Sequence, residues 1–274
     1  MKTRIAPTPS GYLHAGNGAA FVLAWKLARE ADGKLLLRID DLDAERVRPE
    51  YVEDIFENLH WLGVDWDEGP WNAEELQNTW SQHLRMARYS ELVEQLREGG
   101  HLYACTCSRK EVQDRTGSGE YDGHCRSLAL PFDHPDCSWR LHLPQTGKVA
   151  WNTWPDGKQH EATLDMPAPV IRQRNGRPAY QIASLADDVD FGIDLVVRGA
   201  DLLDSTAIQL YLAELLGLGS FSESLFLHHP LLLDKNGAKR SKSHGADSLK
   251  EARLAGEDPH AIHQLADRLK GESL

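Results

Sequence analysis

The chain has 274 residues, of which 41% are hydrophobic and 26% charged, and its formal net charge is −12. This length fits one large domain or two smaller ones around a buried core. No apolar run approaches the roughly 18 residues of a membrane span, and the first residues lack the apolar segment of a signal peptide, so we expect a cytoplasmic protein with no membrane partner. The acidic balance excludes a broadly basic surface, so contact with RNA would need a local basic patch.

The first hundred residues alternate between strand and helix patterns. A short strand is expected at 3–6, a largely buried helix at 17–30 and a buried strand at 34–39. An amphipathic helix begins at Pro49 and ends at Gly63, and another is expected at 79–97. This alternation predicts an α/β fold with a parallel sheet and crossover helices.

The pattern changes after residue 104. Residues 105–165 are rich in cysteine, glycine and proline and contain a short strand pattern at 138–143, which indicates an inserted α+β module. The α/β pattern then returns with a strand at 194–198 and a helix that Asp204 is expected to cap. Residues 247–274 have a polar, helical pattern.

A turn rich in proline and glycine separates the first expected strand from the first expected helix. The start of a helix offers free backbone N–H groups and the positive end of a dipole, which suits phosphate. Gly11 and Gly16 would let the backbone approach a nucleotide closely, and His14 could donate to a phosphate oxygen. Taken alone, a surface turn with one histidine explains this segment equally well.

A basic loop lies far along the chain at residues 237–243. Lys239 and Lys242 could neutralise charge on a transferring phosphoryl or adenylyl group. Taken alone, a solvated run of charges is the simpler interpretation.

Together, the two segments resemble the two signatures of class I aminoacyl-tRNA synthetases. Residues 14–17 (HAGN) are similar to the "HIGH" signature, and residues 239–243 (KRSKS) to "KMSKS", with Arg240 in place of an apolar residue. Three further stretches resemble the glutamyl and glutaminyl subgroup: 4–11, 38–43 and 197–202. The resemblance implies a Rossmann-type nucleotide-binding catalytic domain in two halves, with the inserted module between them and a C-terminal helical region after them. The expected bounds are 1–104 and 166–216 for the catalytic domain, 105–165 for the insert and 217–274 for the C-terminal region.

The same resemblance implies activation of glutamate with ATP and Mg²⁺, with His14 and Lys242 as catalytic residues. It assigns ATP binding to Gly11, His14, Gly16, Asn17, Lys239 and Lys242. It assigns glutamate binding to Arg4, Thr8, Asp40, Tyr180 and Arg198. The family has glutamate where this chain has Asp40, so either the backbone compensates for the missing methylene or the amino acid differs. Structural ion pairs at strand ends are the alternative for Arg4, Asp40 and Arg198.

The chain ends soon after the basic loop, as in shortened members of the subgroup that lack an anticodon-binding domain. These members glutamylate queuosine in tRNA(Asp), so the resemblance implies that tRNA as the partner, and we expect a monomer. Three alternatives stay open: transfer of the amino acid to a small molecule or carrier, a cofactor nucleotidyltransferase, and a non-catalytic RNA-binding paralogue.

Cys105 and Cys107 lie one residue apart, and together with Cys125 they resemble the zinc site of the shortened members, whereas Cys137 is left over and is expected to be structural. Clustered cysteines in a cytosolic protein favour a metal over a disulfide. Three thiolates and one oxygen or nitrogen ligand could hold tetrahedral zinc. The shortened members imply Tyr121 as the fourth ligand, while His124 is chemically the commoner choice.

Overall fold

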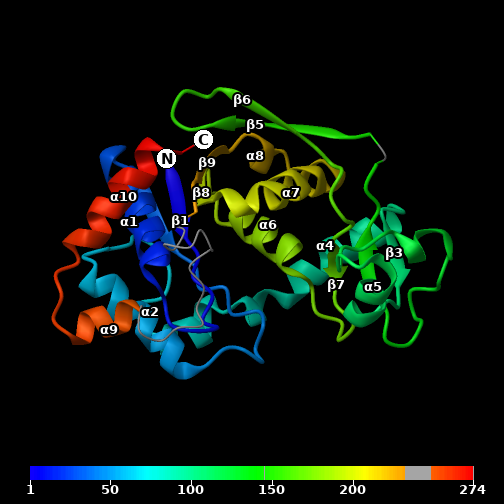
Figure 1. The fold of residues 1–274 in the computed structure, drawn as a ribbon, viewed down its shortest axis with the longest axis horizontal. Coiled ribbons are helices and arrows are strands. Elements are labelled where there is room, and N and C mark those ends of the chain that lie inside the picture. The colour runs from blue at the N-terminus through cyan, green and yellow to red at the C-terminus, as the bar shows by residue number, and fades with distance from the viewer. Residues whose placement is uncertain (145, 232–247, 274) are drawn as a thin grey trace.

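The computed structural model describes residues 1–144, 146–231 and 248–273 (Figure 1). Within them, the main sheet has six strands in the order β2-β1-β8-β9-β5-β6. The first five run parallel, and β6 pairs antiparallel with β5 at one edge. The bounds are β1 (Lys2–Ile5), β2 (Lys34–Leu37), β5 (Lys148–Thr153), β6 (Gln159–Thr163), β8 (Leu195–Gly199) and β9 (Leu225–His229). The α/β fold with a mainly parallel, Rossmann-like sheet is therefore confirmed.

Helices cover both faces of this sheet (Figure 1). The longer ones are α1 (Ala15–Glu30), α2 (Pro49–Trp61), α4 (Met86–Glu98), α6 (Tyr180–Asp190), α7 (Leu203–Leu216) and α10 (His260–Gly271). The shorter ones are α3 (Ala73–Glu75), α5 (Arg109–Thr116), α8 (Gly219–Ser222) and α9 (Leu249–Leu254). No helix in the described ranges is both long enough and apolar enough to span a bilayer.

The residues of β2 show how helices pack on both faces of the main sheet. Leu35 and Leu37 belong to a hydrophobic cluster with α1 and α2, whereas Leu36 belongs to a second cluster with α4, α6 and α7. Successive side chains of a strand point to opposite faces, so three consecutive leucines are buried on both sides.

A second, antiparallel sheet has the order β3-β4-β7 and lies to one side of the main sheet (Figure 1). Its strands are β3 (Leu102–Cys105), β4 (Ser138–Leu141) and β7 (Val170–Arg172). Strands β5 and β6 fall within residues 105–165, yet they extend the main sheet. The boundary between the two sheets therefore differs from the expected bounds of the insert, and the division into domains stays a prediction.

Two local expectations were wrong. The helix expected at 79–97 is interrupted: a π-helical turn (Leu76–Trp80) and a 3-10 turn (Gln82–Arg85) precede α4. Ser81 between them is extended, and its hydroxyl donates to Asp41 Oδ2 at 2.6 Å, so a tertiary contact breaks the helix there. Asp204 does not cap α7 but lies in its first turn, because the 3-10 turn Ala200–Leu202 continues directly into that helix.

Candidate active site

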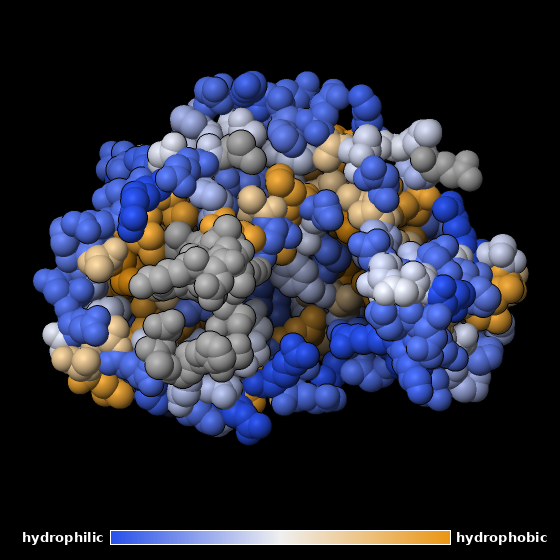
Figure 2. Space-filling model, in the orientation of Figure 1, coloured by the Kyte–Doolittle hydropathy of each residue, from blue (hydrophilic) through white to orange (hydrophobic). Residues whose placement is uncertain are grey.

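A cavity of about 390 Å³ lies at the carboxyl ends of the parallel strands, where nucleotides bind in open α/β sheets. Eight of the residues expected to bind ATP or glutamate line it: Arg4, Thr8, His14, Gly16, Asn17, Asp40, Tyr180 and Arg198. Gly11 is not among the lining residues, and Lys239 and Lys242 lie outside the described residues. Figure 2 shows a hollow on this face, between the part that holds α1 and the part that holds the small sheet.

His14 caps the helix that begins beside this cavity. Its Nδ1 accepts hydrogen bonds from the backbone N–H groups of Gly16 and Asn17, at 3.1 and 3.3 Å. The side chain of Asn17 accepts in turn from the backbone N–H of His14 at 3.1 Å. An imidazole that accepts at Nδ1 carries its proton on Nε2 when neutral. The cap therefore holds a donor ring at the positive end of the dipole of α1.

The described residues on both sides of segment 232–247 lie at the cavity or against the His14 turn. Leu231 lines the cavity. Ser248 forms an antiparallel bridge with His14, and the backbone N–H of Leu249 donates to the carbonyl of Leu13 at 2.8 Å. A Cβ on Gly18 would lie 2.9 Å from Leu249 Cδ1, so this glycine lets Leu249 pack on the first turn of α1.

Buried charges of alternating sign form the floor of the cavity. Asp188 Oδ1 accepts from Arg4 Nε at 2.9 Å and from Arg38 Nη1 at 2.7 Å. Arg38 also forms a fork on Asp40, at 2.6 and 3.2 Å. Burial acts to raise the pKa of Asp188, but attraction to Arg4, Arg38 and the more distant Arg198 outweighs it, and the pKa lies below its usual value. Ion pairs thus fix Arg4 and Asp40 before any ligand binds.

Asp40 responds differently to burial. Burial raises the pKa of its carboxyl to about 6, although Arg38 acts in the opposite direction. The carboxylate is therefore available to a cation at neutral pH and is protonated in mild acid.

Arg198 is the cation in the cavity that lacks a carboxylate partner among the described residues. The residue is 5% exposed, its Nη1 donates to Gln209 Oε1 at 2.7 Å, and neither Nε nor Nη2 has a hydrogen-bond partner in that part of the chain. Burial lowers the pKa of this guanidinium to about 10, so it stays charged at neutral pH. A buried cation with open donors beside a cavity suits a carboxylate ligand.

Several lining residues were not among the expected site residues: Arg38, Asp201, Leu202, His229, Pro230 and Leu231. Arg38 could have been found, because it lies two residues before Asp40 and extended residues at that spacing share a face. His229 ends β9, a strand that the sequence patterns did not predict, and Pro230 and Leu231 follow it. They enter the cavity only because β9 pairs with β8.

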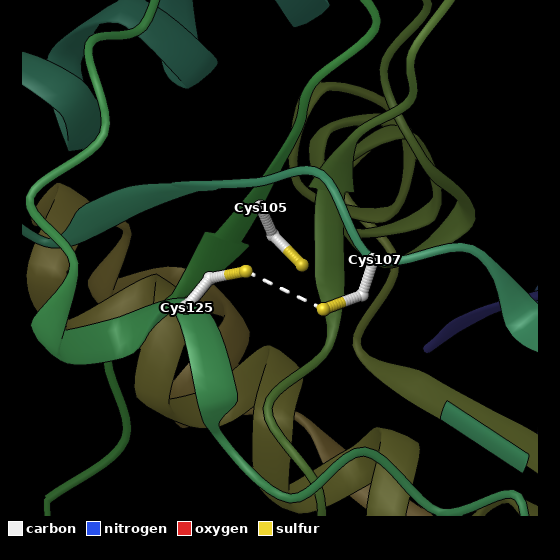
Figure 3. Close-up of side chains that lie close together, drawn as sticks. All are labelled: Cys105, Cys107 and Cys125. Carbon is white, nitrogen blue, oxygen red and sulfur yellow. Dashed lines mark hydrogen bonds between the residues drawn. The ribbon is translucent and has the colours of Figure 1, made fainter. Parts of the chain in front are cut away.

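The second candidate site is the cysteine cluster beside the small sheet. The Sγ atoms of Cys105, Cys107 and Cys125 all lie within 4.8 Å of one another, and Figure 3 shows the three side chains pointing toward a common centre. The Cys107 and Cys125 sulfurs are 3.4 Å apart, well beyond the length of a disulfide bond. Three convergent thiols are consistent with a zinc site.

The surroundings of this cluster bear on its fourth ligand. Tyr121 is buried, and its hydroxyl accepts from the backbone N–H of Cys125 at 2.9 Å. His124 is exposed and is not part of the cluster. Two arginines donate to the sulfurs: Arg140 Nε to Cys105 at 3.4 Å and Arg115 Nη2 to Cys107 at 3.6 Å. Their positive charge would offset the negative charge of thiolates that bound a metal ion.

Comparisons with known proteins agree with this geometry. The family described as tRNA synthetases class I (E and Q), catalytic domain, matches residues 1–269. The chain is 38% identical to the glutamyl-Q tRNA(Asp) synthetase of Nitratidesulfovibrio vulgaris, with 93% of this chain and 82% of that protein covered. It is 35% identical to the glutamate–tRNA ligase of Methylobacillus flagellatus, with 98% of this chain but only 58% of that protein covered.

A solved structure has the same fold. The crystal structure of the glutamate–tRNA synthetase of Elizabethkingia anophelis superposes with a TM-score of 0.74 at 24% identity, covering 93% of this chain and 54% of that one. The matches extend over nearly the whole chain, through both halves of the main sheet and the small sheet. The chain therefore belongs to the class I tRNA synthetases (E and Q), as a catalytic domain of these ligases.

Proposed function

We propose that the chain activates glutamate with ATP and transfers the glutamyl group to the queuosine base of tRNA(Asp). The observation that carries this proposal is the cavity at the carboxyl ends of the strands. It joins a capped helix N-terminus, which suits phosphate, to a buried arginine that forms no ion pair with the described residues, which suits a carboxylate.

In the first step, a carboxylate oxygen of glutamate attacks the α-phosphorus of ATP, and pyrophosphate leaves. This reaction needs positioning and charge neutralisation more than proton transfer. His14 is suited to donate to a phosphate oxygen from the start of α1, where Gly16 and Asn17 also line the cavity. Lys239 and Lys242, with Mg²⁺, would neutralise the phosphates. Of the described residues that flank segment 232–247, Leu231 lines the cavity and Ser248 pairs with His14, which supports the assignment.

Glutamate would lie deeper in the cavity. We assign its two carboxylates to Arg198, Arg4, Tyr180 and Thr8, and its ammonium group to Asp40. Asp40 is one methylene shorter than the family's glutamate, but the fork from Arg38 holds its carboxylate at the cavity wall. The second arginine, Arg4, is held in place from the neighbouring strand β8, because its Nη1 donates to the backbone carbonyl of Val197.

In the second step, a hydroxyl of the acceptor attacks the carbonyl carbon of glutamyl-adenylate, and AMP leaves. The likeness to glutamyl-Q tRNA(Asp) synthetase, of which the chain covers 82%, supports the cyclopentenediol ring of queuosine as that acceptor. A small molecule or a carrier protein is the alternative acceptor.

The cysteine cluster would hold zinc through Cys105, Cys107, Cys125 and Tyr121, as a structural site. The buried hydroxyl of Tyr121 beside Cys125 favours it over the exposed His124. Purified protein should contain about one zinc per chain.

The test is pyrophosphate exchange with each amino acid, followed by transfer of labelled glutamate to tRNA(Asp) with and without queuosine. We expect exchange with glutamate and labelling of queuosine-containing tRNA alone. Exchange without labelling of either tRNA would favour the alternative acceptor, and no exchange with any amino acid would contradict the proposal.

A further inference from the structure

The three arginines of the cavity are held in two different ways. Arg4 and Arg38 each contact the carboxylate of Asp188 within 2.9 Å, so a protein charge already compensates them. Arg198 has no ion pair within the described residues, and its hydrogen-bond acceptor is the neutral amide of Gln209. Of the three, Arg198 alone has no carboxylate within ion-pair distance in the described part of the chain, and Asp188 attracts it only from further away.

The two rings packed against Arg198 are uncharged, while the more distant charges of Arg4 and Asp188 act on its pKa in opposite directions. The Phe226 ring lies 5.6 Å from its guanidinium carbon. His228 is 1% exposed and its Nε2 is 2.7 Å from the hydroxyl of Thr206. Burial, followed by repulsion from Arg198, lowers the pKa of His228 to about 3, so this ring is neutral at physiological pH. Neither neighbour cancels or duplicates the charge of the arginine.

Gln209 lies on α7 and is fully buried. Its Oε1 accepts from Arg198, and its Nε2 donates to the carbonyl of Gln181 at 3.5 Å, which sets the orientation of the amide. A carboxylate of the same shape at this position would form an ion pair with Arg198 and remove the charge that an acidic ligand needs.

We propose that Gln209 is a specificity-determining positioning residue: it anchors Arg198 through a neutral acceptor, so that the cavity selects an amino acid with an anionic side chain over its amide. This inference rests on the proposed function and adds to it the group that sets the preference for glutamate over glutamine. Gln209 acts through Arg198 and does not touch the substrate.

The test compares Gln209→Glu, which is nearly isosteric, with Gln264→Glu, which adds the same charge at an exposed position of α10. We expect Gln209→Glu to lower kcat/KM for glutamate in pyrophosphate exchange by about 100-fold, mainly through a higher KM. The reason is that the new carboxylate neutralises Arg198, the buried partner of the substrate's carboxylate. The discrimination against glutamine should fall by a similar factor, while KM for ATP stays unchanged. Gln264→Glu should behave as the wild type.

A second readout separates this inference from the proposed function. Calorimetric titration of glutamate and of glutamine, without ATP, measures the selectivity of the cavity alone. If the wild type binds glutamate selectively and Gln209→Glu abolishes this selectivity, the inference is supported, whether or not exchange occurs. An absence of exchange would contradict only the proposed function. Unchanged selectivity in Gln209→Glu, or a wild type that binds glutamine as well as glutamate, would overturn the inference.

Discussion

The two candidate sites differ in how their charges are balanced. In the cavity, buried groups of opposite sign alternate, from Arg4 to Asp188 to Arg38 to Asp40. In the cysteine cluster, three like groups converge, and Arg115 and Arg140 supply positive charge from the side.

This difference shows which site depends on a ligand for its shape. The cavity is held together by its own ion pairs and should keep its geometry when no substrate is present. The cluster brings together groups that repel one another once ionised, so a cation at their centre should be needed to hold them. Each of the following predictions tests one side of this contrast.

The largest effect should come from removing the shared carboxylate of the cavity. Asp188→Ala leaves Arg4 and Arg38 buried with fewer partners, and breaking a buried pair in this way costs about 3–5 kcal/mol of unfolding free energy. Urea denaturation of the variant and the wild type measures this loss of unfolding free energy. Asp267→Ala, which breaks the exposed pair with Lys26, is the control and should change little. Equal stability of the two variants would show that the cavity is not organised by its own charges.

His14→Ala tests the cap beside the cavity. It should lower pyrophosphate exchange about 10²–10³-fold, the usual cost of losing a donor to a transition-state oxygen, and destabilise α1 by about 1 kcal/mol. His14→Asn restores a capping side chain without the imidazole, so stability should recover while the rate does not. Recovery of both in His14→Asn would make His14 a structural cap only.

The cluster is tested through its arginines. Arg140→Met removes the donor to Cys105 and should weaken zinc binding about 10–100-fold in competition with a chelator, since partners of metal ligands tune affinity on this scale. Arg172→Met is the matched control, because Arg172 lies on the adjacent strand β7 and stacks on Trp139, 4.4 Å away. If both variants bind zinc equally well, Arg140 contributes no charge to the site.

The smallest effect should appear as a pH dependence. Asp40 has its pKa raised to about 6, so its carboxyl loses its charge as the pH falls through that value. Attraction for an ammonium group is therefore present above about pH 6 and lost below it, and KM for glutamate should rise by up to about tenfold per pH unit below 6. Asp40→Asn should have a high KM with no such slope. A slope that survives in Asp40→Asn would belong to another group.

Much of this architecture could be predicted from short stretches of the chain. The strands expected at 3–6, 34–39, 138–143 and 194–198 each appear within two residues of the expected bounds. Buried aliphatic runs, and the prolines and glycines that bound them, are local signals, and such signals are enough to predict short buried strands. The turn around His14 and the closely spaced Cys105 and Cys107 are local signals of the same kind, whereas the resemblance to the family supplied their expected roles.

The tertiary structure decided what these elements place together. Asp188 meets Arg38 across 150 residues of sequence, and Gln209 meets Arg198 from a different element. Ser81 interrupts a helix because Asp41 accepts its hydroxyl, and β5 joins the main sheet because β9 offers an edge. Periodicity and propensity act within one or two turns of chain, whereas the balance of buried charge depends on which distant side chains the sheet order brings into contact.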